Sequence, residues 1–317
     1  MNRREFITGA AASALAAGCA TKPGATHDPK VARAAGPAQF HVFSKEFQSP
    51  VTSSPEALCD LLAAAGYDGI QWTVRGNGHV KPENAKADLP RYVKIAASRG
   101  LKCSSICTNI TSDAAGRPGP SEGAEDLLRV AADCGITMYR PGYYFYDVKN
   151  ETFAQSRARF HRGFANLAAL GARTGVKATY QNHSSWDETV FGGAIWDLYD
   201  CIRDLDPRDV GLEYDPMHAL FETNNSWTHG FDLVMPWIAA VDLKDSYFVL
   251  DPENPKKTRR QTVAAGGGVV PWAQVRAHLD AAGARPLFNL HFEHAFDKTN
   301  LAKSVGDELA FFRKVFA

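Results

Sequence analysis

Two patterns of apolar and polar residues alternate along the chain from about residue 39 to its C-terminal end. Short apolar runs rich in β-branched and aromatic residues predict strands, and longer stretches with apolar residues three and four positions apart predict amphipathic helices. The predicted strands are residues 39–47, 69–75, 102–108, 136–144, 176–183, 210–215, 238–244 and 286–293. The predicted helices are residues 53–65, 89–98, 121–134, 152–174, 194–204, 227–235, 271–282 and 298–315.

Capping residues mark several of the predicted helix ends. Ser54 and Pro55 are suited to an N-cap and the first helical position, and Ser121 is suited to cap the helix that follows it. Gly66 and Gly175 are expected to end helices.

Eight strand–helix pairs in one chain predict parallel strands joined by crossover helices. A doubly wound open sheet would instead carry a glycine-rich phosphate-binding turn after its first strand, and residues 45–55 contain no such turn. We therefore predict the α/β class and a single (β/α)8 barrel that spans residues 39–317.

Polar residues gather where four of the predicted strands end, in the runs KATYQNHS, VGLEYDPMH, AAVDLKD and PLFNLHFEH. Because side chains alternate across a strand, residues two apart share a face. The resulting sets are Thr179, Gln181 and His183; Glu213 and Asp215; Asp242 and Lys244; and His291 and Glu293. In a (β/α)8 barrel the active site lies at the carboxyl ends of the strands, so these sets are expected to converge.

Carboxylate, amide and imidazole groups together suit a divalent cation. The alternative is a buried network of ion pairs and hydrogen bonds that closes the barrel mouth.

Several motifs in their order resemble those of the xylose isomerase-like TIM barrels, the sugar phosphate isomerase and epimerase group. The motifs are TVRGNGHVKPEN, YQNHS, YDPMHA, DLKD, AAGGGVVPW and LHFEH. The resemblance covers nearly the whole chain after its N-terminal segment and implies a sugar substrate.

The resemblance also implies a metal held by Glu, Asp, His and Glu on the last four strands. The matching positions here are Gln181, Asp215, Asp242 and Glu293, so two match and two depart. Gln181 can still offer its carbonyl oxygen, and an oxygen-rich set favours Mn or Mg over Zn. The two departures equally fit a site in which the metal is weakly held or absent.

The implied chemistry is metal-assisted proton abstraction by a sugar isomerase, epimerase or lyase. Gln181 cannot act as a base, so Glu293 is expected to be the base, with Lys244 and His183 as further catalytic residues. The competing interpretation is a non-catalytic sugar-binding barrel. For Lys244 the structural alternative is an ion pair with Asp245 or Glu213.

Five further residues are expected to contact the substrate: His218, Arg75, His79, Arg140 and His291. A structural or capping role is the alternative for His218, and an exposed loop is the alternative for Arg75 and His79. Aromatic stacking on a sugar ring is considered for Trp72, Trp186 and Tyr143, against ordinary burial.

The N-terminal segment, residues 1–19, has the layout of a bacterial export signal, MNRREFITGAAASALAAGC. Arg3 and Arg4 resemble the twin-arginine signal, and the end at Cys19 resembles a lipobox. We expect a periplasmic protein, attached to the membrane if Cys19 carries a lipid, with a flexible tether over residues 20–38. An exported location disfavours phosphorylated sugars.

The formal net charge is zero, which argues against a nucleic-acid partner and against a DNA-repair endonuclease of a related barrel type. The cysteines after Cys19 fall mostly in apolar patterns, and we expect buried thiols rather than disulfides.

Overall fold

The structure is a computed structural model that describes residues 36–48, 50–111, 119–184 and 189–316. The export signal, most of the tether and Trp186 lie outside the described residues.

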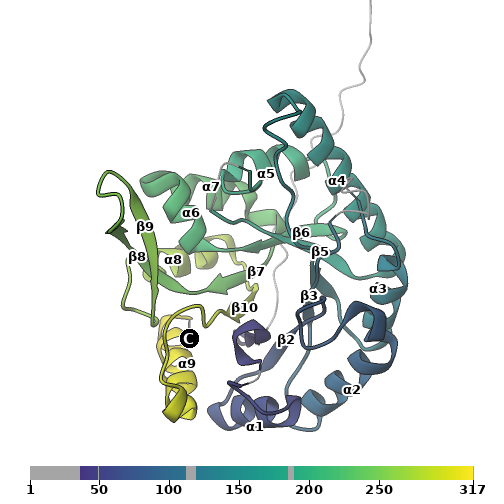
Figure 1. Cartoon of the computed structure of the whole chain (residues 1–317), viewed down its shortest axis with the longest axis vertical. Coiled ribbons are helices and arrows are strands. Elements are labelled where there is room, and N and C mark those ends of the chain that lie inside the picture. The colour runs from purple at the N-terminus through teal and green to yellow at the C-terminus, as the bar shows by residue number, and fades with distance from the viewer. Residues whose placement is uncertain (1–35, 49, 112–118, 185–188, 317) are drawn as a thin grey trace, which may run out of the picture.

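Eight parallel strands form a closed barrel in which β1 pairs with both β2 and β10 (Figure 1). The barrel strands are β1 (Phe40–Phe43), β2 (Gly69–Thr73), β3 (Ser105–Cys107), β4 (Met138–Arg140), β5 (Lys177–Gln181), β6 (Val210–Tyr214), β7 (Ile238–Leu243) and β10 (Leu287–Leu290). The predicted single (β/α)8 barrel is confirmed. The pairing of β6 with β7 shifts register between Leu212 and Glu213, a local irregularity of the kind found beside functional sites.

Helices surround the barrel on its outer side (Figure 1). They are α1 (Pro55–Ala65), α2 (Ala85–Ala97), α3 (Ala124–Asp133), α4 (Phe153–Thr174), α5 (Ile195–Ile202), α6 (Pro216–Thr223), α7 (Trp227–Val234), α8 (Trp272–Ala282) and α9 (Leu301–Phe316). Short 3-10 turns cover Ser44–Phe47, Pro82–Asn84, Asn224–Ser226, Met235–Trp237 and Lys298–Asn300.

The predicted helix caps are confirmed in part. The Ser54 hydroxyl accepts from the backbone N–H of Ala57, and Gly66 and Gly175 adopt the left-handed conformation that ends α1 and α4. The prediction for Ser121 is wrong, since α3 begins only after Gly123, at φ 73° and without a side-chain cap.

Several predicted boundaries are also wrong. The first predicted strand, residues 39–47, ends at Phe43 and turns into the 3-10 segment, because an apolar run does not by itself distinguish the two. Helix α2 begins at Ala85 rather than at residue 89, because its first turn, AKAD, contains no large apolar residue and gives no periodic signal.

An antiparallel hairpin, β8 (Asp245–Leu250) and β9 (Thr258–Val263), leaves the barrel wall after β7. Neither this hairpin nor α6 was predicted. The sequence of β9, TRRQTV, is polar on both faces and mostly exposed, so it lacks the alternation of a half-buried strand. The hairpin stands beside α6 (Figure 1), where the rings of Phe248 and Phe221 stack at 3.7 Å.

The strands carry aromatic residues on their outer faces and polar residues inside the barrel. Tyr180 packs on Phe164 of α4 at 5.1 Å between ring centroids, and Phe288 packs on Phe316 of α9 at 4.3 Å. The alternate residues, such as Gln181 and Asn289, are buried and hydrogen-bond across the barrel. The hydrophobic core therefore lies between the strands and the helices, and the barrel interior is left for polar chemistry.

Candidate functional site

A layer of hydrogen-bonded polar side chains fills the barrel interior beneath the strand ends. The Gln71 amide donates to both carboxyl oxygens of Glu213 at 3.2 Å and to the Ser105 hydroxyl at 3.0 Å. The Asn289 amide donates to the Gln71 carbonyl at 3.0 Å and to Glu213 Oε1 at 3.1 Å. This layer holds Glu213 in place from below.

Gln181, at the end of β5, joins the two predicted aspartate ligands. Its Nε2 donates to Asp242 Oδ2 at 2.6 Å and to Asp215 Oδ2 at 3.1 Å. Its Oε1 accepts from Arg140 Nη1 at 3.1 Å and from the Tyr143 hydroxyl. Because a guanidinium can only donate, Arg140 fixes which end of the amide faces the carboxylates.

Lys244 follows β7 and lies between two carboxylates. Its Nζ is 3.1 Å from Asp215 Oδ2 and 3.1 Å from Glu293 Oε2, with 2% of the lysine side chain and 22% of the Glu293 side chain exposed. Burial opposes the charge of Lys244, but Asp215 and Glu293 outweigh it and raise its pKa. Burial likewise opposes the charge of Glu293, yet Lys244 and His291 hold its pKa well below the usual value. The pair is therefore an ammonium and a carboxylate at neutral pH.

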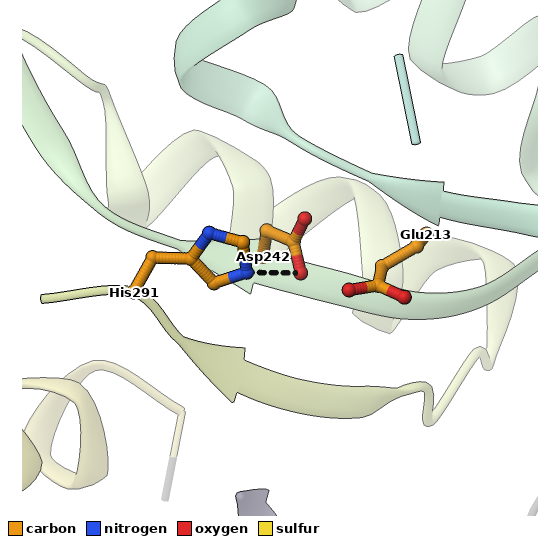
Figure 2. A group of neighbouring side chains, drawn as sticks. All are labelled: Glu213, Asp242 and His291. Carbon is orange, nitrogen blue, oxygen red and sulfur yellow. Dashed lines mark ion pairs between the residues drawn. The ribbon is translucent and has the colours of Figure 1, made fainter. Parts of the chain in front are cut away.

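Asp242 of β7 lies between His291 and Glu213 (Figure 2). His291 Nε2 is 3.1 Å from Asp242 Oδ1, and His291 Nδ1 is 3.5 Å from Glu293 Oε1. Glu213, Asp242 and His291 each offer a ligand atom within 4.8 Å of the others, which makes them a candidate metal-binding group. Asp242 is the one member that this group shares with the ligands expected from the sequence.

Glu213 and Asp242 are a buried pair of carboxyls that titrate together. Burial and the neighbouring charge of Asp242 raise the pKa of Glu213 to about 8. Burial acts in the same direction on Asp242, but His291 and Arg140 outweigh it and lower the pKa of Asp242. The proton held by the pair therefore resides on Glu213.

Two histidine rings in contact lie beside this cluster, with 3.7 Å between the ring centroids of His183 and His218 and a tilt of 35° between their planes. His183 Nδ1 is 2.7 Å from the Ser184 carbonyl, which can only accept, so that nitrogen carries the proton. His218 Nδ1 lies 2.9 Å from Arg260 Nη1, which can only donate, so the His218 proton is on Nε2, 3.5 Å from Asp215 Oδ2. Burial keeps both rings neutral: it lowers the pKa of His183 to about 3 and that of His218 well below its ordinary value.

Arg260 reaches this histidine pair from the hairpin strand β9. Its Nη1 also donates to the Ser184 hydroxyl at 2.6 Å. Arg260 was not predicted as a site residue, because nothing in the run TRRQTV indicates that one of its arginines reaches the barrel mouth. Gln71 and Asn289 were missed for a similar reason, since each is one amide in an otherwise apolar strand.

The remaining predicted substrate contacts divide into two kinds. Arg140 lies over the Phe43 ring at 4.5 Å, and Arg75 approaches the same ring at 5.8 Å, so both lie near His291, which is 4.7 Å from that ring. His79 instead ties its loop to the barrel, with Nδ1 2.9 Å from the Thr73 hydroxyl and 3.2 Å from that of Ser44.

The contacts of Trp72 and Asp245 decide between alternatives that the sequence left open. Trp72 is fully buried between the rings of His79 and Tyr92, so it is a core residue rather than a surface for a sugar. Asp245 is not the partner of Lys244. It accepts from the backbone of Gly266 and Val270 and holds the loop before α8.

In the described residues the five cysteines are free thiols. The expectation of buried thiols is confirmed for Cys59, Cys103, Cys107 and Cys201, whereas Cys134 is half-buried. None of the helices in the described part of the chain combines the length and apolar character needed to cross a membrane.

The model of the family described as "Xylose isomerase-like TIM barrel" matches residues 59–315. Searching curated proteins gave no match.

Solved structures resemble the chain over most of its length. One is 3-keto-D-glucoside 4-epimerase from E. coli in its apo form, at 13% identity and a TM-score of 0.64, covering 87% of this chain and 99% of that one. Another is D-psicose 3-epimerase from Clostridium cellulolyticum H10 with D-tagatose, at 12% identity and a TM-score of 0.64, covering 88% and 99%. D-allulose 3-epimerase from Methylomonas sp. in complex with D-allulose gives 14% identity and a TM-score of 0.61, covering 88% and 98%. At these identities the likeness shows the fold alone.

Proposed function

The chain belongs to the xylose isomerase-like TIM barrel family, and on that premise we propose that it is a sugar isomerase, epimerase or lyase. The proposed reaction is abstraction of a proton from a carbon next to the carbonyl of a sugar or keto-sugar. The observation that carries the proposal is the Glu293–Lys244 pair, which sets a partly exposed carboxylate 3.1 Å from a buried ammonium. A carboxylate can remove the proton, and an adjacent cation stabilises the enolate that forms.

Glu293 is the proposed base. Its low pKa keeps it ionised, although a base of low pKa has little driving force for proton abstraction. A substrate oxygen that draws Lys244 away from Glu293 would raise the basicity of the carboxylate, since Lys244 is the largest influence that lowers its pKa.

His183 is the proposed second proton carrier. Its ring carries the proton on Nδ1, so Nε2 is the nitrogen that would accept and return a proton. Burial and the charge of Lys244 lower its pKa to about 3, so, as for Glu293, a substrate oxygen that draws Lys244 away would raise its basicity. Gln181 has no proton to exchange, so a reaction with glutamates on both faces of the carbon is not proposed.

Five residues are proposed to bind and orient the sugar. Arg75, Arg140 and His291 share contact with one phenylalanine ring near Glu293. His218 is proposed to act together with His183, whose ring it contacts. His79 is proposed to act indirectly, by holding the loop that carries Arg75.

The family implies a divalent metal, and the expectation from the sequence was Mn or Mg held by Gln181, Asp215, Asp242 and Glu293. The donor set of this structure does not fit that ion. Gln181 turns its N–H groups toward both aspartates, and Lys244 lies between Asp215 and Glu293. In the Glu213, Asp242 and His291 group, Asn289 Nδ2 donates to Glu213 Oε1 and lies 3.4 Å from Asp242 Oδ1, while His291 Nε2 meets the same Asp242 oxygen. The proposed reaction therefore includes no step that depends on a metal.

The proposed location is the periplasm. Support comes from Arg3 and Arg4 as a twin-arginine signal and from Cys19 as a lipid attachment site. Cell fractionation of the wild type and of Cys19→Ala tests this: release of the variant, but not of the wild type, from the membrane fraction is expected. A periplasmic enzyme would meet free, oxidised or glycosidic sugars, and neighbours that act on a 3-keto-glucoside or on ketoses give the first substrates to try.

Solvent exchange tests the proposed reaction without knowledge of the product. The protein is incubated in D2O with 3-keto-glucosides and with ketohexoses, and deuterium at carbon is followed by NMR. Incorporation that is lost in Glu293→Gln and kept in Glu308→Gln, a buried glutamate outside the cluster, is the expected result. Saturable sugar binding with no exchange would favour the non-catalytic barrel instead.

A further inference from the structure

Lys244 occupies a specific place in the barrel mouth. Its ammonium bridges Asp215, directly after β6, and Glu293, just beyond β10, at 3.1 Å from each. These are the two positions that match carboxylate ligands in the family pattern. We propose that the Lys244 ammonium takes the place of the divalent cation, so that this chain carries out its reaction without a metal. The inference rests on the proposed function for its chemistry but not for its main test.

The neighbouring amide supports this interpretation. A metal ligand at position 181 would have to turn an oxygen toward Asp215 and Asp242, and Gln181 turns N–H groups toward both. The reverse orientation would place those N–H groups against the Arg140 guanidinium, which has no acceptor. The side chain that departs from the family pattern therefore acts as a donor to the carboxylates.

The charges of the cluster are balanced by the chain itself. Lys244 pairs with Asp215 and Glu293, His291 pairs with Asp242 at 3.1 Å, and Arg140 lies 3.7 Å from the fourth carboxyl, Glu213. A divalent ion would add two charges to a nearly neutral group whose carboxylates already have donors.

The chemistry needs no oxidant, reductant or further reactant. The C–H bond beside the substrate carbonyl breaks, its proton moves to Glu293, and its electron pair moves to the carbonyl oxygen. An ammonium has three N–H donors, so Lys244 can donate to the resulting enolate oxygen while it keeps a carboxylate partner. Delivery of a proton to the opposite face of the same carbon, by the second proton carrier proposed above, completes an epimerisation. Delivery to the former carbonyl carbon, with the hydroxyl proton moving to the enolate oxygen, completes an isomerisation. Loss of a β-substituent with its bonding electrons, as the carbonyl re-forms, completes a lyase reaction.

Binding of Mn²⁺ by the substrate-free protein tests the proposal. Lys244→Met keeps the length of the side chain but removes the charge, which leaves Asp215 and Glu293 without their shared cation. We expect electron paramagnetic resonance to show all Mn²⁺ free in the presence of the wild type and a bound fraction with Lys244→Met. At about 100 times its dissociation constant, Mn²⁺ should raise the melting temperature of the variant by roughly 5 °C and leave the wild type unchanged.

Lys303→Met is the matched control, because Lys303 is an exposed lysine of α9, and it should behave as the wild type. If Lys244→Met does not fold alone, refolding is compared with and without MnCl2. Recovery only with the ion supports the proposal, and equal failure in both contradicts it.

Two results would overturn the inference. One is stoichiometric Mn²⁺ binding by the wild type that Asp215→Asn abolishes. The other is a folded Lys244→Met variant with no more affinity for Mn²⁺ than Lys303→Met.

These outcomes are separate from the fate of the proposed function. If the wild type binds Mn²⁺ and incorporates deuterium into the sugar, the proposed function is supported and the metal-free inference is wrong. Alternatively, the wild type binds no Mn²⁺ and incorporates no deuterium, while Lys244→Met binds Mn²⁺. In that case the proposed function is wrong, and the assignment of the Lys244 ammonium to the cation position is supported.

Discussion

Replacing Glu213 by glutamine should remove a pH-dependent loss of stability. Glu213 is fully buried on β6, and its pKa rises from 4.5 to about 8 because burial and the charge of Asp242 both oppose its ionisation. Between these two pH values the unfolded chain has released the proton and the folded chain still binds it. Stability therefore falls as pH rises through this window.

The magnitude follows from the same pKa values. At about 1.4 kcal/mol for each pKa unit, the carboxyl costs at most about 5 kcal/mol once the pH exceeds about 8. Relaxation and water penetration reduce such penalties, so we expect about 2–3 kcal/mol. Glutamine mimics the protonated acid, which accepts from Gln71 and Asn289.

Urea denaturation at several pH values between about 5 and 9 measures the effect. The variant should match the wild type at the acid end and become progressively more stable toward the alkaline end. Glu253→Gln, at an exposed position of the hairpin loop, is the control and should give no pH-dependent difference. Parallel profiles for Glu213→Gln and the wild type would refute the assignment of a protonated Glu213 in the barrel interior.

Three other substitutions test the remaining parts of the structure. Arg260→Gln should raise KM about tenfold or more with a smaller change in kcat, because it removes the donor to Ser184 and to His218, a proposed substrate-binding residue, and leaves Glu293 in place. An unchanged KM would show that Arg260 does not position His218 for the substrate. Glu308→Gln should stabilise the protein above about pH 7 and not below about pH 4.5. Burial raises the pKa of Glu308 to about 7, so its ionisation destabilises the folded wild type as pH rises through this window. Melting temperatures measured below about pH 4.5 and above about pH 7 check this, and the same difference between variant and wild type at both pH values would contradict it. Gln181→Glu should lower the melting temperature, because it sets a third carboxylate against Asp215 and Asp242; a variant as stable as the wild type at neutral pH, without added metal, would count against the assigned orientation of the amide.

The barrel was predictable because each strand carries its signal locally. Runs such as VGLEY in β6 are apolar on the face that packs on helices, and the helices between them show periodic apolar residues and caps such as Ser54. Once eight such pairs alternate, parallel pairing and right-handed crossovers leave few other arrangements. The hairpin β8–β9 escaped prediction because its stability comes from contacts such as Phe248 on Phe221, which no local pattern contains.

The sequence predicted that polar residues converge at the strand ends, but it did not predict which of their atoms form hydrogen bonds and ion pairs. Alternation along each strand determined that Gln181, Asp242 and Glu293 point into the barrel, since a side chain's face depends only on its position in the strand. Which atoms meet depends on neighbours remote in sequence: Arg140 on β4 orients the Gln181 amide, and Lys244 lies between carboxylates from two other strands. The sequence by itself therefore determined the fold and most of the ionisable groups at the strand ends. Only the tertiary structure added Gln71, Asn289 and Arg260 to them and decided which groups donate, which accept and where the positive charge lies.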